Sequence, residues 1–316
     1  AAQEGAAVVV VAAGRGRPAG CSGIPVIAVA DPRKALGDLA TAVRKQYRGR
    51  VVGVTGSNAK TTTKELVAAA LSPAGQVLRT QGNLNTDVGL PLTVLEATGK
   101  EDFWVLEMAM RAPGEIAYLA RIAEPHVAVV TNVAGAHLGR LGSLDEVARA
   151  KGEIFGGLAP DGIAVLPVDE PRLELEVAKL PEARKRRFGF AGPSARSFVC
   201  IMEFIPAGAA GSLVRLSVGY PPVVVRLPLA GEHNARNAAA ALAVSHALGV
   251  PLLPAVAALQ RATLPPHRSH VLALGGRTVL DDCYNANPTS MSAALRTLVG
   301  SAGQFGRAFS ILGDML

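Results

Sequence analysis

Residues 53–63 read GVTGSNAKTTT, a run of small residues that ends in Lys60 and three threonines. Apolar Val51 and Val52 precede the run, and the helix-forming stretch KELVAAAL follows it. This order predicts a strand, a tight loop and a helix. Such a loop aims unpaired backbone N–H groups outward at a helix N-terminus, where the helix dipole adds partial positive charge. The stretch therefore predicts a phosphate-binding loop in an α/β protein.

The loop matches the general phosphate-loop pattern GxxxxGK[ST] only in part. The two glycines of that pattern fall on Val54 and Ala59 in this chain. Lys60 would bring a full positive charge to the β- and γ-phosphates, and Thr61 would offer a hydroxyl to Mg²⁺. On this loop alone, a glycine-rich turn with a surface lysine remains an alternative.

Composition excludes several classes of function. Apolar residues make up 49% of the 316 residues and aromatic residues 4%, as in a folded α/β protein with a large core. The net charge of +7 comes from scattered basic residues without interleaved aromatic side chains, so we expect no nucleic-acid partner. No apolar run reaches the roughly 18 residues that a membrane span needs. We expect a cytoplasmic, monomeric protein.

The cysteines and the densest basic run have no predicted chemical role. Cys21, Cys200 and Cys283 lie far apart and show neither CxxC nor Cys/His spacing, which predicts a reducing compartment and no structural zinc. The run RKRR at residues 184–187 is interpreted as a solvated turn.

Strand and helix patterns alternate after residue 49. The predicted elements are the strand and helix around the loop, a strand at 104–108, a helix from Pro113, a strand at 127–131 and a helix capped by Ser143. Alternation of this kind predicts a mostly parallel sheet with helices on both faces. Short alternating strands between 163 and 230 predict an antiparallel extension, and a helix at about 234–248 follows.

The two ends of the chain carry less pattern. Residues 1–48 contain two short apolar runs and then a helix that would begin at Asp31 and Pro32. These three elements are too few to form a domain by themselves. We assign residues 49–308 to a central domain. The final residues 309–316, FSILGDML, are predicted to form one strand of a further domain.

Three polar residues point to a site beside the loop. Glu107 ends the apolar stretch FWVLE, His137 follows the apolar stretch VAVVTN, and Lys151 lies in ARAKGEIF. Ligands of open parallel sheets collect beyond the carboxyl ends of the strands, so Glu107 and His137 can face one site. Each residue taken singly also has a structural explanation: a carboxylate leaving a strand, a loop histidine, and a lysine with a packed stem.

Lys151 is the most informative of the three residues. Leu144, Val147, Ile154 and Leu158 recur at helical spacing, and Lys151 falls on the same stripe, so its side chain is predicted to point inward. A buried lysine loses its proton easily and then presents a nucleophilic amine. Such an amine can add CO₂ to become a carbamate, an anionic oxygen ligand for Mg²⁺.

Seven segments occur in an order that resembles the Mur ligase family of peptidoglycan synthesis. They are GVTGSNAKTTTKE, GNLNTDVGLPLTVL, LEMAMRAPGEI, TNVAGAHL, GSLDEVARAKGEIF, GEHNARNAAAA and DDCYNANPTSM. The resemblance covers residues 49 to about 300 and is strongest to the member that joins D-alanyl-D-alanine to UDP-N-acetylmuramoyl-tripeptide through an acyl phosphate. It implies an ATP- and Mg²⁺-dependent ligase with those two substrates. Alternatives are a sister ligase that adds a single amino acid, and a P-loop NTPase switch without ligase activity.

The resemblance also implies residue roles. Lys60, His137 and Lys151 would be catalytic, with Lys151 carbamylated. The metal ligands would be Thr61, Glu107, His137 and Lys151. Asn83, Asn85 and Thr86 would contact the muramoyl-peptide substrate. Adenine, ribose and phosphate contacts would come from Gly56, Ser57, Asn58, Ala59, Lys60, Thr61, Thr62, Asn234, Asn237, Arg268 and Asp282.

Two residues depart from the pattern of this member. Ala59 replaces a usual glycine, so the loop backbone is expected to be strained, and His267 precedes Arg268 where glycine is usual. By the same resemblance, residues 1–48 match the last part of a UDP-substrate-binding domain, and residues 309–316 match the first strand of a C-terminal domain. The chain is therefore expected to be a fragment that is inactive by itself.

Overall fold

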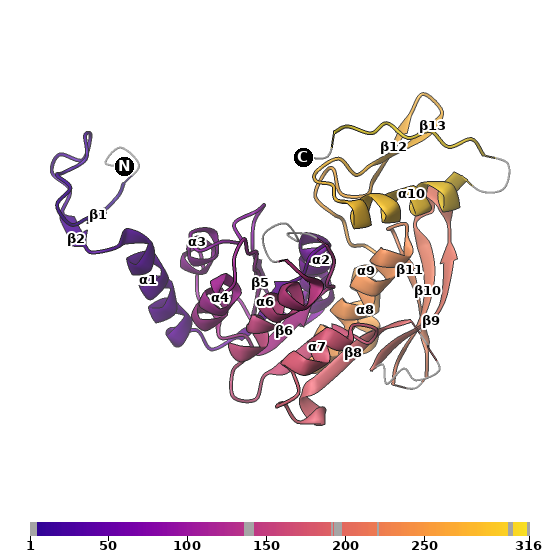
Figure 1. Cartoon of the computed structure of the whole chain (residues 1–316), viewed down its shortest axis with the longest axis horizontal. Coiled ribbons are helices and arrows are strands. Elements are labelled where there is room, and N and C mark those ends of the chain that lie inside the picture. Colours follow the sequence, from indigo (N-terminus) through magenta and orange to yellow (C-terminus); the bar gives the residue numbers. More distant parts are fainter. Residues whose placement is uncertain are drawn as a thin grey trace.

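A nine-stranded sheet forms the centre of the protein. The computed structural model describes residues 5–135, 142–190, 192, 198–219, 221–302 and 306–314. Across the sheet the order is β11-β10-β9-β8-β7-β6-β3-β5-β4 (Figure 1). The strands, in that order, are Val223–Leu227, Ser212–Val218, Val199–Pro206, Lys185–Phe190, Ile163–Pro167, Val127–Val130, Arg50–Thr55, Phe103–Glu107 and Val77–Arg79.

Strand direction confirms the predicted mostly parallel sheet. All pairs from β4 through β9 are parallel, and β10 and β11 are added antiparallel to β9. The antiparallel extension is therefore shorter than predicted, because β7 and β8 continue the parallel part.

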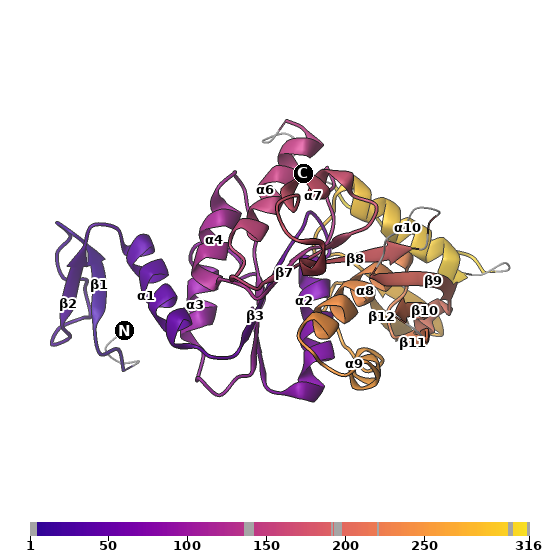
Figure 2. The same ribbon diagram turned by 90° about the horizontal axis from the view of Figure 1, so that it is seen from below.

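Helices cover both faces of the sheet, as Figure 2 shows. One face carries α1 (Pro32–Gln46), α3 (Gly89–Leu95), α4 (Glu115–Ala123), α6 (Leu144–Gly156) and α7 (Pro171–Glu176). The opposite face carries α2 (Lys60–Leu71), α8 (Glu232–Ala247) and α9 (Leu252–Leu259). Because side chains alternate along a strand, Val51 of β3 packs in the core between the sheet and the helices α1, α3, α4, α6 and α7. Val52 packs in the opposite core, beneath α2, α8 and α9.

The predicted caps place two of the helices. Asp31 accepts from the backbone N–H groups of Arg33 and Lys34 at 2.8 and 3.2 Å and caps α1. Ser143 accepts from the N–H of Glu146 at 3.2 Å and caps α6. Caps of this kind fix where each helix leaves its preceding loop.

Buried Arg44 holds α1 against the central sheet. Its guanidinium donates to the carbonyl oxygens of Ala123 and Glu124, at 2.6 and 2.8 Å, where α4 ends. A cation at this end satisfies carbonyl groups that have no partner within the helix and interacts favourably with the helix dipole. The segment before α1 holds a parallel two-stranded sheet, β1 (Val9–Ala12) and β2 (Val26–Val29), which lies apart from the large sheet (Figure 1).

A second peripheral unit follows α9. It contains the antiparallel hairpin of β12 (His270–Leu274) and β13 (Arg277–Asp281), and the helix α10 (Pro288–Ala302). Figure 1 shows this unit above α8 and α9. Three short 3₁₀ turns, Ser72–Ala74, Glu182–Arg184 and Gly208–Ala210, complete the described elements.

Two local predictions have different outcomes. Residues 306–314 form neither helix nor strand and Ile311 is fully exposed, and the assignment of residues 309–316 to a strand of a further domain stays a prediction. The run 184–187 is not a solvated turn, since Lys185 begins β8 and the guanidinium of Arg187 pairs with Glu174 at 2.6 Å. None of the described helices is long and apolar enough to cross a membrane.

Candidate active site

The candidate site lies at the carboxyl end of β3. The chain leaves β3 through α2 toward β4 at one sheet edge, and β6 later pairs with the opposite side of β3. A crevice forms where connections diverge in this way, and ligands of open α/β sheets bind there. A cleft of about 570 Å³ opens at this point, within the range of small-molecule sites, roughly 300–1,000 Å³.

The two residues after β6, Thr131 and Asn132, anchor the predicted phosphate loop. The backbone N–H groups of Ser57 and Asn58 donate to the carbonyl and side-chain oxygens of Asn132, at 3.0 and 2.9 Å. The hydroxyl of Thr131 donates to the carbonyl of Asn58 at 2.7 Å. Thr131 also explains Gly56, since a Cβ at Gly56 would lie 1.8 Å from the Thr131 hydroxyl oxygen. The loop is therefore preorganised by a neighbouring strand end.

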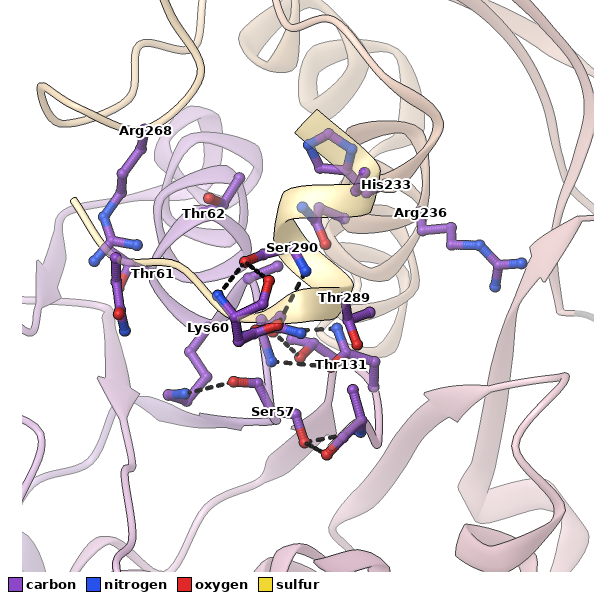
Figure 3. A pocket seen from close by; sticks show the side chains of 18 of the residues that line it. Ser57, Lys60, Thr61, Thr62, Thr131, His233, Arg236, Arg268, Thr289 and Ser290 are labelled. Atoms are coloured by element: carbon purple, nitrogen blue, oxygen red, sulfur yellow. Dashed lines mark hydrogen bonds between the residues drawn. The ribbon is translucent and has the colours of Figure 1, made fainter. Parts of the chain in front are cut away.

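Lys60 begins α2 and faces the cleft beside Thr61 and Thr62 (Figure 3). Its ammonium donates to the carbonyl oxygens of Gly56 and Ser57, at 3.0 and 3.3 Å, and so folds back over the loop. Burial lowers the pKa of Lys60; the charge of Glu107 opposes this shift and that of Arg268 adds to it. An anion in the cleft would stabilise the ammonium better than neutral carbonyls do.

Glu107 is the buried anion of the site, with 1% of its surface exposed. Its Oε1 accepts from the side-chain amide of Asn85 at 2.8 Å. Its Oε2 has no hydrogen-bond partner among the described residues, and the ammonium of Lys64 lies 4.0 Å away. A buried carboxylate oxygen without a donor is costly and is satisfied by a cation. Glu107 and Thr61 both line the cleft and offer the oxygen ligands that Mg²⁺ takes.

Lys64 compensates the charge of Glu107, and sequence reasoning missed it. The side chain is 1% exposed, and its ammonium donates to the carbonyl of Thr80 at 2.6 Å. The ammonium also lies 2.9 Å from a carboxylate oxygen of Glu65. Lys64 therefore places a positive charge 4.0 Å from the buried carboxylate of Glu107.

Lys151 points inward from α6, as its helical spacing predicted, and is 2% exposed. Burial lowers the pKa of its ammonium to about 7, and the charge of Lys60 adds to the shift. A large fraction of the side chain is therefore a neutral amine near neutral pH. Lys151 is not among the residues that line the cleft.

Asn234 and Asn237, on the first turns of α8, line the cleft but are also bonded within the protein. Asn234 donates to the carbonyl of Ala230 at 2.8 Å, and Asn237 donates to the amide oxygen of Asn234 at 3.1 Å. The hydroxyl of Thr63 donates to the amide oxygen of Asn237 at 3.3 Å. These bonds fix the amides and leave fewer of their groups free for a ligand.

Arg268 and Asp282 line the cleft at the open end of the β12–β13 hairpin. Arg268 lies before β12, and Asp282 follows β13. Figure 3 shows Arg268 reaching toward Thr61 from the segment before β12. Its guanidinium lies 3.9 Å from the ring centre of Tyr284. Asp282 accepts from the N–H of Ser269 at 2.9 Å, and burial raises the pKa of its carboxyl group. The hairpin thus carries one cation and one carboxylate into the site.

The cleft brings together thirteen of the residues that the sequence predicted for the site: Ser57, Asn58, Ala59, Lys60, Thr61, Thr62, Asn83, Asn85, Glu107, Asn234, Asn237, Arg268 and Asp282. Gly56 packs behind the loop, and Thr86 and Lys151 do not line the cleft. His137 lies outside the described residues, and its role stays a prediction.

Several residues of the site were not predicted. The guanidinium of Arg236 makes two bonds to Asp169, at 3.0 and 2.7 Å, which join α8 to the loop after β7. The side-chain amide of Asn287 donates to the side chain of Asn58, so the α10 segment contacts the phosphate loop. Asn132 is the second residue after the apolar strand β6, a position that could have identified it. The other contacts join segments far apart in the chain.

A preorganised phosphate loop, a lysine at the helix start and a buried carboxylate define a nucleotide-binding α/β protein of the P-loop type. Residues 54–245 match the Mur ligase middle domain. A UDP-N-acetylmuramoyl-tripeptide--D-alanyl-D-alanine ligase of Escherichia coli (strain K12) is 39% identical over 293 residues, which are 92% of this chain and 64% of that protein. The chain belongs to the Mur ligase family.

Solved structures agree with this assignment. A crystal structure of MurF from Acinetobacter baumannii is 36% identical and superposes with a TM-score of 0.82 over 90% of this chain and 61% of that one. MurF ligase from Thermotoga maritima in complex with ADP is 29% identical, with a TM-score of 0.81 over 94% of this chain and 67% of that one. The chain thus spans less than two thirds of the length of the E. coli relative.

The backbone of Ala59 yields a first prediction. Ala59 has φ 61°, in the left-handed region, where an alanine is strained by about 1–2 kcal/mol. Ala59→Gly removes this strain but gives the unfolded chain more freedom, so we expect a net stabilisation of up to about 1 kcal/mol. Ala69→Gly, in the last turn of α2, is the control and should lose up to about 1 kcal/mol. Urea unfolding measures both; a destabilised Ala59→Gly protein would contradict the strain.

The environment of Lys151 yields a second prediction. Its pKa is about 7 in the folded protein and 10.5 without perturbation, so between these values the unfolded chain binds the extra proton. Stability relative to Lys151→Met should therefore rise with pH from about 7, by up to about 1.4 kcal/mol per pH unit. Urea unfolding in CO₂-free buffer between pH 7 and 9 measures this difference. A difference that does not change with pH would show that the folded lysine keeps an ordinary pKa.

Proposed function

We propose that the protein joins D-alanyl-D-alanine to UDP-N-acetylmuramoyl-tripeptide with hydrolysis of ATP. The observation that carries this proposal is the 39% identity, over 92% of the chain, to an E. coli protein named for that reaction. The cleft supports it, because the phosphate loop, Lys60 and Glu107 meet at one end of the sheet. The proposal includes a cytoplasmic location, since both ATP and a UDP-linked substrate are present in that compartment. It also includes a monomeric protein.

The nucleotide phosphates would lie on the phosphate loop. The backbone N–H groups at the start of α2 and the Lys60 ammonium would donate to oxygens of the β- and γ-phosphates, with Arg268 as a second cation. Asp282 would bind the ribose, and Asn234 or Asn237 the adenine. The solved T. maritima relative holds ADP, which supports a nucleotide in the equivalent fold.

Magnesium would be held by Thr61 and Glu107, with His137 as a further predicted ligand. The unpartnered Oε2 of Glu107 supports this placement, because it is buried and has no donor among the described residues. When bound, the cation would neutralise the charge that develops on the phosphate oxygens.

The proposed reaction has two steps. A terminal carboxylate oxygen of the tripeptide attacks the γ-phosphorus, and the bond to the β-phosphate oxygen breaks, so that ADP leaves and an acyl phosphate forms. The amine of D-alanyl-D-alanine then attacks the acyl carbon, loses a proton and expels inorganic phosphate. Lys60 stabilises the negative charge on the transferred group, and the rigid loop keeps that group aligned.

Lys151 is proposed to carry a carbamate. Its neutral amine nitrogen would attack the carbon of CO₂ and release a proton to solvent, which leaves an anionic carboxylate on the side chain. The inward position of Lys151 and the pKa of about 7 support this step, because the amine is available near neutral pH. The carbamate would add a second anionic oxygen donor near the metal ligands and offset the charge of Lys60.

The muramoyl-peptide would lie along the loop 82–86. Asn83 lines the cleft with an exposed side chain, which suits substrate contact. Asn85 binds Glu107 through its amide nitrogen, so we assign it a positioning role for the carboxylate. Thr86 does not line the cleft and stays a predicted substrate contact.

The ligation assay tests the proposed function. Because the 316 residues are expected to be inactive by themselves, the assay uses a chain extended to the length of the E. coli relative, of which this chain spans 64%. With Mg-ATP and UDP-N-acetylmuramoyl-tripeptide, ADP release should require D-alanyl-D-alanine, and the amide product should accumulate in equal amount. Glu107→Gln removes the buried charge and should lower kcat by at least about a hundredfold. The exposed Glu203→Gln is the matched control and should leave kcat unchanged.

Two results would favour other functions. ATP hydrolysis without any joined product would favour a nucleotide-dependent switch. Preferential joining of one free amino acid would favour a sister ligase of the same family. Neither result is expected, because the relatives that match over nine tenths of the chain carry the dipeptide-adding name.

The carbamate makes a separate prediction. Lys151→Ala should lose most activity, and millimolar acetate or propionate should restore part of it by placing a carboxylate where the carbamate would lie. Lys60→Ala should lose activity without any rescue, because a carboxylate cannot replace its positive charge. The carbamate carbon is also observable by ¹³C NMR after equilibration with labelled bicarbonate. A spectrum without a signal that depends on Lys151 would rule the carbamate out.

A further inference from the structure

Three potential metal ligands meet at the base of the β12–β13 hairpin, outside the site described above. His267 lies before β12, Asp281 ends β13, and Cys283 follows two residues later. The Nδ1 atom of His267 lies 2.7 Å from Oδ2 of Asp281 and 3.6 Å from Sγ of Cys283. All three potential ligand atoms lie within 4.8 Å of one another.

The donor set is that of a zinc-type ion. Imidazole nitrogen, carboxylate oxygen and thiolate sulfur all bind Zn²⁺, at about 2.0–2.3 Å. Tetrahedral geometry at those bond lengths places donor atoms about 3.3–3.8 Å apart. The histidine–cysteine spacing of 3.6 Å already fits, and the histidine–aspartate pair needs to open by less than about 1 Å. Mg²⁺ prefers oxygen ligands alone and would not select this cluster.

We propose that His267, Asp281 and Cys283 form a binding site for Zn²⁺ or a similar divalent transition metal. The fourth position would be filled by water, because the side chains of His267 and Cys283 are exposed. The thiol of Cys283 would lose its proton when the metal binds. The spacing of the cysteines in the sequence predicted no zinc, because these ligands come together only when the hairpin closes.

The site lies between residues of the nucleotide-binding cleft. Arg268 follows His267, and Asp282 separates Asp281 from Cys283, so metal ligands and cleft residues alternate along both segments. Among the described residues, few hydrogen bonds join the segment before β12 to the segment after β13. They include Tyr284 N–H to His267 O at 3.1 Å and Ser269 N–H to Asp282 at 2.9 Å. A bound metal would add a strong cross-link there and hold Arg268 and Asp282 in place. This consequence for the cleft rests on the proposed function, whereas metal binding does not.

Two substitutions test the site without a large risk of unfolding. His267 has φ 64°, so His267→Gly removes the imidazole and also relieves left-handed backbone strain. Cys283→Ser keeps the size of an exposed side chain. Cys200→Ser, a partly exposed cysteine outside the cluster, is the matched control.

Titration with Co²⁺ and competition for Zn²⁺ against a chromophoric chelator measure binding to the untagged chain. We expect one Zn²⁺ per chain and a thiolate-to-cobalt charge-transfer absorption that disappears in Cys283→Ser. Zinc affinity should fall at least about tenfold in both cluster variants and remain unchanged in Cys200→Ser. Zinc should also slow hydrogen exchange at the amides of Ser269 and Tyr284 in the parent chain.

The proposal is wrong if cobalt produces no thiolate charge-transfer band, or if Cys283→Ser binds zinc as tightly as the parent chain. Unchanged exchange at Ser269 and Tyr284 in a zinc-loaded chain would overturn the cross-link. None of these measurements uses a nucleotide or a ligase substrate. A protein that bound zinc but joined no peptide would therefore refute the proposed function and leave the metal site standing.

Discussion

The candidate site depends on the burial of one carboxylate, that of Glu107. Because a buried charge must be compensated, side chains of two other segments lie at this carboxylate, and a third segment binds the backbone of Glu107. Asn85 donates to one of its oxygens, Lys64 from α2 supplies a positive charge, and Thr80 accepts from its backbone N–H at 2.9 Å. The same Thr80 accepts from Lys64 through its carbonyl group. Removing Glu107 would leave Lys64 with Glu65 as its acidic partner and would free the loop around Asn85.

Around Glu107, the charge of the cleft favours a polyanion. Lys60 and Arg268 line the cleft, and Lys151 is buried near enough to Lys60 for that charge to lower its pKa. Oε2 of Glu107 has no hydrogen-bond donor among the described residues. Among the described residues, the partners of the Lys60 ammonium are carbonyl oxygens of its own loop. A phosphate group could replace these weak partners with charge-assisted bonds, and a metal ion could occupy the remaining carboxylate oxygen. A phosphate thus supplies the negative charge that Lys60 lacks as a partner, and a metal ion supplies the positive charge that the carboxylate oxygen lacks. This explains why such sites bind phosphate and metal together.

Local patterns predicted much of this arrangement, and long-range contacts account for what they missed. The alternation of strands and helices placed the phosphate loop and Glu107 at one edge of the sheet, and helical spacing placed Lys151 inside. Lys64 gave no signal, because its buried partners lie on β5 and beside β4. Asn85 was predicted to bind substrate, whereas its amide binds Glu107.

The cleft combines a rigid part with a lightly packed part. The phosphate loop and Glu107 belong to strand ends whose side chains are buried on both faces of the sheet. Arg268 and Asp282 belong instead to a hairpin whose strand residues are exposed or half-buried, and α10 buries only Thr297. A segment with so few buried apolar contacts opens at a lower free energy than the sheet does. A nucleotide that contacts both parts would hold them together, so part of its binding energy would order the hairpin, and any contact that orders the hairpin beforehand would tighten nucleotide binding.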